Sequence, residues 1–283
     1  MRATPEQISL SSYNPIDAEV YRISKSSLMG YMMCPRQFYW RYIADIPRPP
    51  ATEQMIRGTQ IHNVMEAGLL QGPEQIIPTA IEQGVEDDDG VDSLNLMLHQ
   101  IAYDIGGFDV VEAEVKHEVY EEFNGHPIIW VGLIDGVLRH PETGGLVLVE
   151  LKTGNMGTSK LSRTRKELVY YSRLLGMLGY DEVTHFLYVC PDYEIPEDGG
   201  DKLLNEGNKR GKTMWLGAER GFALMEPFSK RSYNAFEESL YDTIESLTSH
   251  QWPMKWNDYF CPMWCDFSLN CEAELNGITE WGL

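Results

Sequence analysis

The spacing of apolar residues predicts helices at the front of the chain and a mixture of strands and helices behind them. Apolar positions recur at the helical interval in four segments, which are 24–47, 54–70, 161–178 and 233–250. One or two further helices are expected over 74–106, separated by an acidic turn at 86–90. Alternating or β-branched segments predict strands at 110–121, 127–139, 146–152 and 183–190. Residues 195–212 are polar and rich in glycine, so we expect a loop there.

This order of elements is typical of an α/β protein. The turn Pro141–Gly145 would join two antiparallel strands, and the helix at 161–178 would cross over between two strands of one sheet. We expect an N-terminal arm over 1–22 and a single domain over 23–283. Within that domain we expect three parts, which are a helical lobe at 23–106, a core at 107–250 and a tail at 251–283.

Composition and charge narrow the class of protein. The chain has 283 residues, of which 43 are acidic and 23 are basic, and its formal net charge is −20. That charge argues against a protein that binds nucleic acid over its whole surface, but it permits a local basic groove or an acidic cation site. There is no apolar run of membrane-spanning length, and the N-terminus lacks an apolar signal core. We therefore expect no membrane span, no export and a cytoplasmic protein.

Charged residues interrupt an apolar strand at one position. Glu150 and Lys152 point to the same face of the strand, because side chains alternate along it. A hairpin would bring Asp135 beside Glu150, and two neighbouring carboxylates repel unless a cation lies between them. Oxygen ligands at a sheet edge suit Mg²⁺ or Mn²⁺. The structural alternatives are an ion pair at a strand end and a turn aspartate beside Gly136.

Asp135 followed by Glu150-x-Lys152 resembles the core of the PD-(D/E)XK nuclease superfamily, and the surrounding residues are similar to its RecB-like branch. The resemblance implies a restriction-endonuclease-like core, in which helices flank a mixed central sheet. It also implies that Asp135, Glu150 and Lys152 are catalytic. The implied ligands of the divalent cation are His62, Asp135, Glu150 and the carbonyl of Leu151. For His62, a purely structural role is the alternative.

The same branch carries a QxxxY motif on the next helix, where this chain has Glu167 and Tyr171. Glutamate replaces the usual glutamine, and its charge would repel phosphate. The resemblance implies DNA binding near these two residues, whereas simple core packing is the alternative for Tyr171. A basic group beside the motif predicts phosphate contacts and consists of Lys160, Arg163, Arg165 and Lys166. A second group lies at Lys209–Lys212, and solvated surface is the alternative for both.

Four of the five cysteines fall into a pattern. Cys34 lies near the front, and a C-x3-C-x5-C cluster near the end contains Cys261, Cys265 and Cys271. Four thiolates suit a 4Fe–4S cluster or tetrahedral zinc, and the spacing does not separate these. The pattern resembles the iron–sulfur staple of the AddB nuclease domain and of CRISPR-associated RecB-like exonucleases, whose tail spacing is C-x2-C-x5-C. The resemblance favours iron–sulfur, and we expect Cys190 to be a buried apolar residue.

Taken together, the motifs predict a metal-dependent DNA exonuclease that acts on single strands or duplex ends. Recombination, repair and CRISPR-type adaptation are the pathways that the resemblance suggests. The alternative is a DNA-binding or end-selecting subunit that works with an integrase, recombinase or helicase, with nuclease activity subordinate or lost. The intact set of Asp135, Glu150 and Lys152 favours the enzyme.

Overall fold

The computed structural model describes residues 20–44, 46, 50–154, 158–195, 200–207, 209 and 211–277, except the side chains of 158–160, 200, 201, 203 and 206. The strands are β1 (Tyr21–Ser24), β2 (Val110–Phe123), β3 (His126–Arg139), β4 (Leu146–Leu151), β5 (Val183–Cys190), β6 (Thr213–Leu216) and β7 (Phe222–Pro227). The helices are α1 (Lys25–Met33), α2 (Pro35–Phe38), α3 (Glu53–Gln71), α4 (Ile76–Gln83), α5 (Asp89–Ile105), α6 (Thr158–Met177), α7 (Gly200–Gly207), α8 (Lys230–Thr248), α9 (Phe260–Trp264) and α10 (Ser268–Leu275). A π-helical segment spans Tyr39–Ile43, and a 3₁₀ turn spans Pro73–Gln75.

The strands form one mixed sheet, which confirms the predicted α/β class with helices flanking a central sheet. Within the described residues the strand order is β1-β3-β4-β5-β7-β6, and β2 pairs with β3. Strands β3 and β4 are antiparallel, whereas β4 and β5 are parallel and are joined by the crossover helix α6. Strand β7 runs antiparallel to both β5 and β6. No helix in the described part of the chain is long and apolar enough to cross a membrane.

The chain divides into two compact units. One unit consists of Ala51–His117 and Gly132–Asn234. The other consists of the described residues of Met1–Pro50, Glu118–Val131 and Ala235–Leu283.

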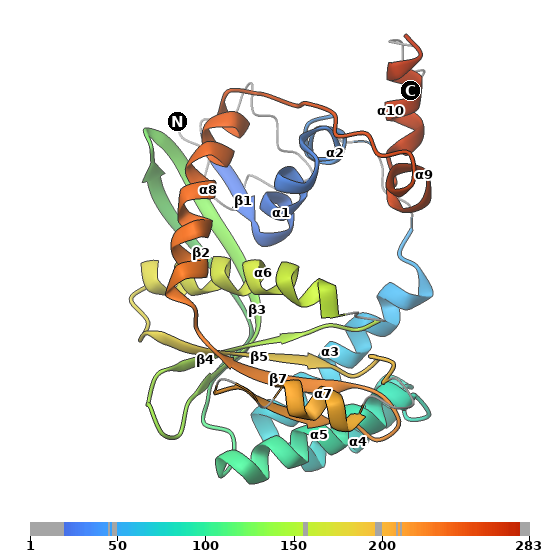
Figure 1. The fold of residues 1–283 in the computed structure, drawn as a ribbon, viewed down its shortest axis with the longest axis vertical. Helices are drawn as coiled ribbons and strands as arrows, with labels where there is room; N and C mark the ends of the chain where they lie inside the picture. Colours follow the sequence, from blue (N-terminus) through green and yellow to red (C-terminus); the bar gives the residue numbers. More distant parts are fainter. Residues whose placement is uncertain are drawn as a thin grey trace. The chain divides into compact units, whose positions relative to one another are not determined.

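In the unit of Ala51–His117 and Gly132–Asn234, helices cover both faces of the sheet. Helix α6 lies on one face of β4 and β5, and α3, α4 and α5 lie on the other (Figure 1). The apolar residues of β4 at alternate positions, Val147, Val149 and Leu151, pack into a core with α3 and α5. The intervening residue Glu150 is therefore on the α6 face, as the alternation of the strand predicts.

Helix α3 is built to present His62 at the edge of this core. Its N-cap Thr52 accepts a hydrogen bond from the Met55 N–H. Its buried face includes Ile61 and Met65, so the packing of neighbouring turns fixes the direction of His62. Gly58 passes close to the end of β4, because a Cβ there would lie 3.1 Å from the Thr153 hydroxyl.

The other unit contains β1, which pairs in parallel with the first part of β3, from Tyr21 opposite Ile128 to Ser24 opposite Val131. The predicted single helix over 24–47 is wrong, because the chain is extended at Cys34 and α2 begins at Pro35. Proline disfavours the helical conformation in the residue before it, which explains this break. The interruption separates Cys34 from the regular backbone of both helices.

The loop expected over 195–212 is also wrong in part, because α7 lies within it. The glycines that suggested a loop stand at the two ends of this helix, Gly200 and Gly207. The six residues between them contain no glycine or proline, which leaves room for helical turns.

Gly132 leaves no room for a larger side chain between β3 and α6. A Cβ at this position would collide with Leu174 and lie 3.1 Å from the Tyr171 ring. We expect Gly132→Ala to lower the free energy of unfolding by about 1–3 kcal/mol, because the core cannot open without moving α6. Urea denaturation measures the change.

Gly176→Ala is the matched control, because Gly176 lies in α6 with no atom within 4 Å of its Cβ position. It should leave stability unchanged or raise it by about 0.5–1 kcal/mol, since alanine favours helix. Equal effects from the two substitutions would contradict the close packing of β3 against α6.

Candidate active site

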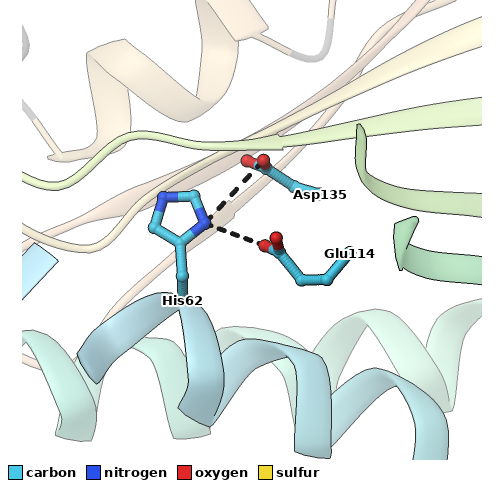
Figure 2. A group of neighbouring side chains, drawn as sticks. All are labelled: His62, Glu114 and Asp135. Carbon is cyan, nitrogen blue, oxygen red and sulfur yellow. Dashed lines mark hydrogen bonds and ion pairs between the residues drawn. The ribbon is translucent and has the colours of Figure 1, made fainter. Parts of the chain in front are cut away.

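Three side chains from three separate elements converge on one point. His62 comes from α3, Glu114 from β2 and Asp135 from β3. The His62 Nδ1 atom is 3.1 Å from Glu114 Oε1 and 3.7 Å from Asp135 Oδ1, and Figure 2 shows both carboxylates directed at the same ring nitrogen. One ligand atom from each residue lies within 4.8 Å of the others. The donor set of one imidazole and two carboxylates fits Mn²⁺ or Mg²⁺.

Glu114 reaches this point through an unusual backbone conformation. Its φ is +51°, in the left-handed region that residues other than glycine rarely adopt. A left-handed residue inside a strand interrupts the regular alternation of side chains and redirects one of them. Such strain persists only where surrounding contacts impose it, and it is concentrated at functional sites in proteins.

Asp135 is positioned where β3 and β4 separate. The last paired residues of the ladder are Gly136 and Val149. Beyond them, Asp135 Oδ2 accepts a hydrogen bond of 2.7 Å from the backbone N–H of Leu151. This bond leaves the other carboxylate oxygen, Oδ1, on the side of His62. The predicted closeness of Asp135 to Glu150 across the hairpin follows from the same register.

Lys152 lies between two carboxylates. Its Nζ donates to Glu150 Oε1 and, at 2.8 Å, to Glu167 Oε2 on α6. Glu150 and Glu167 are both buried. A buried charge needs a partner, so this ammonium compensates carboxylates from two elements.

The electrostatics of the group favour bound cations. Burial alone would lower the pKa of His62, but the hydrogen bond to Glu114 and the charges of Asp135, Glu114 and Glu150 raise it above its ordinary value. The surrounding carboxylates therefore favour positive charge at this position. A divalent cation would satisfy the same negative field.

The residues predicted to contact DNA differ in their surroundings on α6. Arg165 donates two hydrogen bonds to buried Glu226, at 2.6 and 2.9 Å, and Lys212 also pairs with Glu226. Arg163 is largely exposed and lies 3.7 Å from Glu167, and Lys166 is exposed. Arg163 and Lys166 are thus presented outward, whereas Arg165 is engaged in an internal ion pair. The Lys160 side chain and Arg210 lie outside the described residues.

Tyr171 is buried one turn further along α6. Its hydroxyl donates to the carbonyl oxygen of Leu133 on β3. Burial, together with the charges of Glu150 and Asp135, raises the pKa of Tyr171 and keeps the hydroxyl protonated as a donor. This contact ties α6 to the strand that carries Asp135.

A second network holds α3 against the segment that follows Lys152. Arg57 donates to Asp88 and Asp192, with two bonds of 2.7 Å to the latter. Asp192 also accepts a 2.5 Å hydrogen bond from the Gly154 N–H. These residues line a pocket of about 590 Å³ that also includes Thr153. The network joins the helix of His62 to the end of β4.

The four patterned cysteines line one small pocket in their own unit. Cys34, Cys261, Cys265 and Cys271 surround a cavity of about 60 Å³. All are free thiols. Three N–H groups point at their sulfur atoms: the Trp40 indole donates to Cys271 and the Asn257 backbone to Cys261, each at 3.3 Å, and the Gln37 side-chain amide donates to Cys265 at 3.8 Å. Burial, and the neighbouring thiols, raise the pKa of Cys265 and Cys271.

Cys190 belongs to the other unit, in β5. It is fully buried, and burial raises its pKa to about 12. The prediction of a buried apolar role for this residue agrees with that environment.

Sequence reasoning did not single out Glu114, Arg57 or Asp192. Glu112 and Glu114 alternate within the same strand pattern and look equivalent. The backbone turn at Glu114 separates them, and Glu112 instead binds His117 and Tyr180. The sequence carries no local signal for that difference.

Comparison with known proteins gives a family match. The sequence profile of the PD-(D/E)XK nuclease superfamily matches residues 22–272. No curated protein matches the chain. Among solved structures, the crystal structure of SSO0001 is 16% identical, with a TM-score of 0.39, over 89% of this chain and 86% of that one. Rai1 of Scheffersomyces stipitis, in complex with 3'-NADP⁺ and calcium, is 11% identical, with a TM-score of 0.21, over 80% and 73% of the two chains.

The Arg57 network predicts a stability defect. Asp192→Ala removes two bonds from Arg57 and leaves the Gly154 N–H without this acceptor. We expect the free energy of unfolding to fall by about 2–4 kcal/mol, as measured by urea denaturation. Glu194→Ala is the control, because Glu194 lines the same pocket but is exposed. Its effect should stay within about 0.5 kcal/mol, and equal losses would rule out the proposed importance of the network.

Proposed function

This chain belongs to the PD-(D/E)XK nuclease superfamily, and we propose on that premise that it is a RecB-like, metal-dependent DNA exonuclease. The observation that carries the proposal is the convergence of His62, Glu114 and Asp135 on one point. Nucleases of this superfamily use divalent metal, and the donor atoms of this group suit it. The proposed substrates are single strands or duplex ends, in recombination, repair or CRISPR-type adaptation.

The residues that would hold the cations are His62, Glu114 and Asp135, together with Glu150 and the Leu151 carbonyl. A bound divalent cation supplies Lewis-acid polarisation of a phosphoryl oxygen and activation of water. Asp135 is held for this role by the Leu151 N–H, which fixes one oxygen and leaves the other toward His62.

Lys152 would place positive charge where the phosphate becomes more negative during cleavage. Its ammonium is held at the end of β4 by Glu150 and Glu167, so little reorganisation is needed when a phosphate arrives. Arg163 and Lys166 are exposed on α6 and would contact the phosphate backbone without reading sequence.

The nuclease proposal is tested with end-labelled single-stranded DNA. Cleavage should require Mg²⁺ or Mn²⁺ and stop with EDTA. Asp135→Asn or Glu150→Gln should lower the rate by about a hundredfold or more, since each replaces a charged carboxylate ligand with a neutral amide. Glu82→Gln, an exposed change on α4, should cleave at the wild-type rate.

A circular single strand should resist the enzyme if the activity needs a free end. If the circle is cleaved as fast as the linear strand, the enzyme is an endonuclease and not an exonuclease. Full activity in EDTA, or in either carboxylate variant, would refute the assigned mechanism.

We propose that the cysteine pocket holds a structural 4Fe–4S cluster. Four thiols line it, and N–H donors to sulfur are a feature of cluster environments. A tetrahedral zinc site would bring its sulfur atoms to about 3.8 Å from one another, given a Zn–S distance of about 2.3 Å. The four thiolates also suit that zinc geometry, and the resemblance of the cysteine pattern to iron–sulfur nucleases is what favours the larger cluster.

The cluster is tested on anaerobically purified protein. It should be brown, with broad absorbance near about 400 nm from thiolate-bound iron. Cys34→Ala should lose the colour and become sensitive to protease, because Cys34 would link the front of the chain to its tail. Cys190→Ala is the control and should keep the colour. A colourless protein with one tightly bound zinc would show that the site holds zinc rather than an iron–sulfur cluster. A stable, fully active Cys34→Ala protein would show that neither metal site links Cys34 to the tail.

A further inference from the structure

Lys152 and a bound cation would compete for Glu150. The Lys152 ammonium donates to Glu150 Oε1, and Glu150 is also a proposed cation ligand. Two positive charges that share one carboxylate repel each other, so binding of the metal weakens the bond between Lys152 and Glu150. Without another partner, Lys152 would lose its position at the step where the proposed reaction needs it.

Glu167 supplies a second carboxylate from a different element. It lies on α6, opposite the end of β4, and its Oε2 accepts from Lys152 at 2.8 Å. Glu167 is buried, so its charge is weakly screened and its orientation is restricted.

The other oxygen of Glu167 has its own cationic neighbour. Arg163, one helical turn earlier, places its Nε 3.7 Å from Glu167 Oε1. The two oxygens therefore face different cations, and Oε2 is the one directed at Lys152.

The geometry points to Glu167 as a positioning residue that retains Lys152 when Glu150 binds a divalent cation. This inference rests on the proposed function and adds to it the means by which lysine and metal coexist. Glu150 can exchange its lysine for the cation at low cost, because the ammonium remains paired with Glu167. A glutamine at this position would still accept a hydrogen bond from Lys152, but it would not neutralise the charge.

The inference is tested by the Mn²⁺ affinity of the DNA-free protein, measured by isothermal titration calorimetry. Four proteins form a double-mutant cycle: wild type, Glu167→Ala, Lys152→Met and the double variant. Glu167→Ala should weaken Mn²⁺ binding by about tenfold, because Lys152 then loses its Glu167 partner and competes with the cation for Glu150. In the Lys152→Met background the same change should have an effect of less than about twofold, since no lysine remains to be held.

Two further variants separate this role from a general loss of negative charge. Glu167→Gln should retain part of the affinity that Glu167→Ala loses, because the amide oxygen still accepts from Lys152. Glu66→Ala is the control, because Glu66 lies on α3 near the site, where burial and then the charge of Glu114 raise its pKa. It should weaken Mn²⁺ binding by the same factor with or without Lys152. Thermal unfolding of each variant confirms that it is folded.

The outcomes distinguish the inference from the function on which it rests. If Glu167→Ala weakens Mn²⁺ binding equally in both backgrounds, Glu167 acts through its charge or as a ligand, and the positioning role is wrong while the nuclease proposal stands. If the wild-type protein binds no Mn²⁺, the proposed function fails and the inference fails with it. Loss of the Glu167→Ala effect in Lys152→Met, with Mn²⁺ binding intact, supports both.

Discussion

The hydrogen bond from the Leu151 N–H to Asp135 is the interaction on which the arrangement of the site depends. The ladder between β3 and β4 ends at Gly136 and Val149, and a buried backbone donor beyond it needs an acceptor. The Asp135 carboxylate supplies that acceptor and keeps the two strands together where they separate. Because one oxygen is used in this way, the other is directed at His62. One side chain therefore satisfies a backbone donor and also presents an oxygen to the group of His62 and Glu114.

The remaining charges near the site follow from the cost of burying carboxylates. Several acidic side chains have a basic partner: His62 for Glu114, Lys152 for Glu150 and Glu167, and Arg57 for Asp192. The pairs of His62 with Glu114, of Lys152 with Glu167 and of Arg57 with Asp192 join different segments, so each also fixes the distance between two parts of the fold. The same electrostatic requirement thus assembles the site and holds α3, β4 and α6 around it.

The sequence predicted the parts of the site that depend on regular periodicity. Alternation along β4 placed Glu150 away from the core, and the hairpin register placed Asp135 near it, as the structure confirms. Glu114 escaped prediction because its position depends on a left-handed backbone that its residue type disfavours. Long-range packing imposes that conformation, and no local pattern encodes it. The helix break at Cys34 did carry a local signal, Pro35, which the apolar periodicity around it obscured.

The burial of Cys190 affects how the cysteines of this protein react with alkylating reagents. Alkylating reagents attack the thiolate, and a thiol with a pKa of about 12 is almost entirely protonated at neutral pH. Cys190 should therefore stay unlabelled in the native protein, whereas Cys34 and Cys261 are only half-buried. Labelling of the folded protein consequently reports on the pocket cysteines alone, and the thiols that become reactive on unfolding are Cys190 and the other buried cysteine, Cys271.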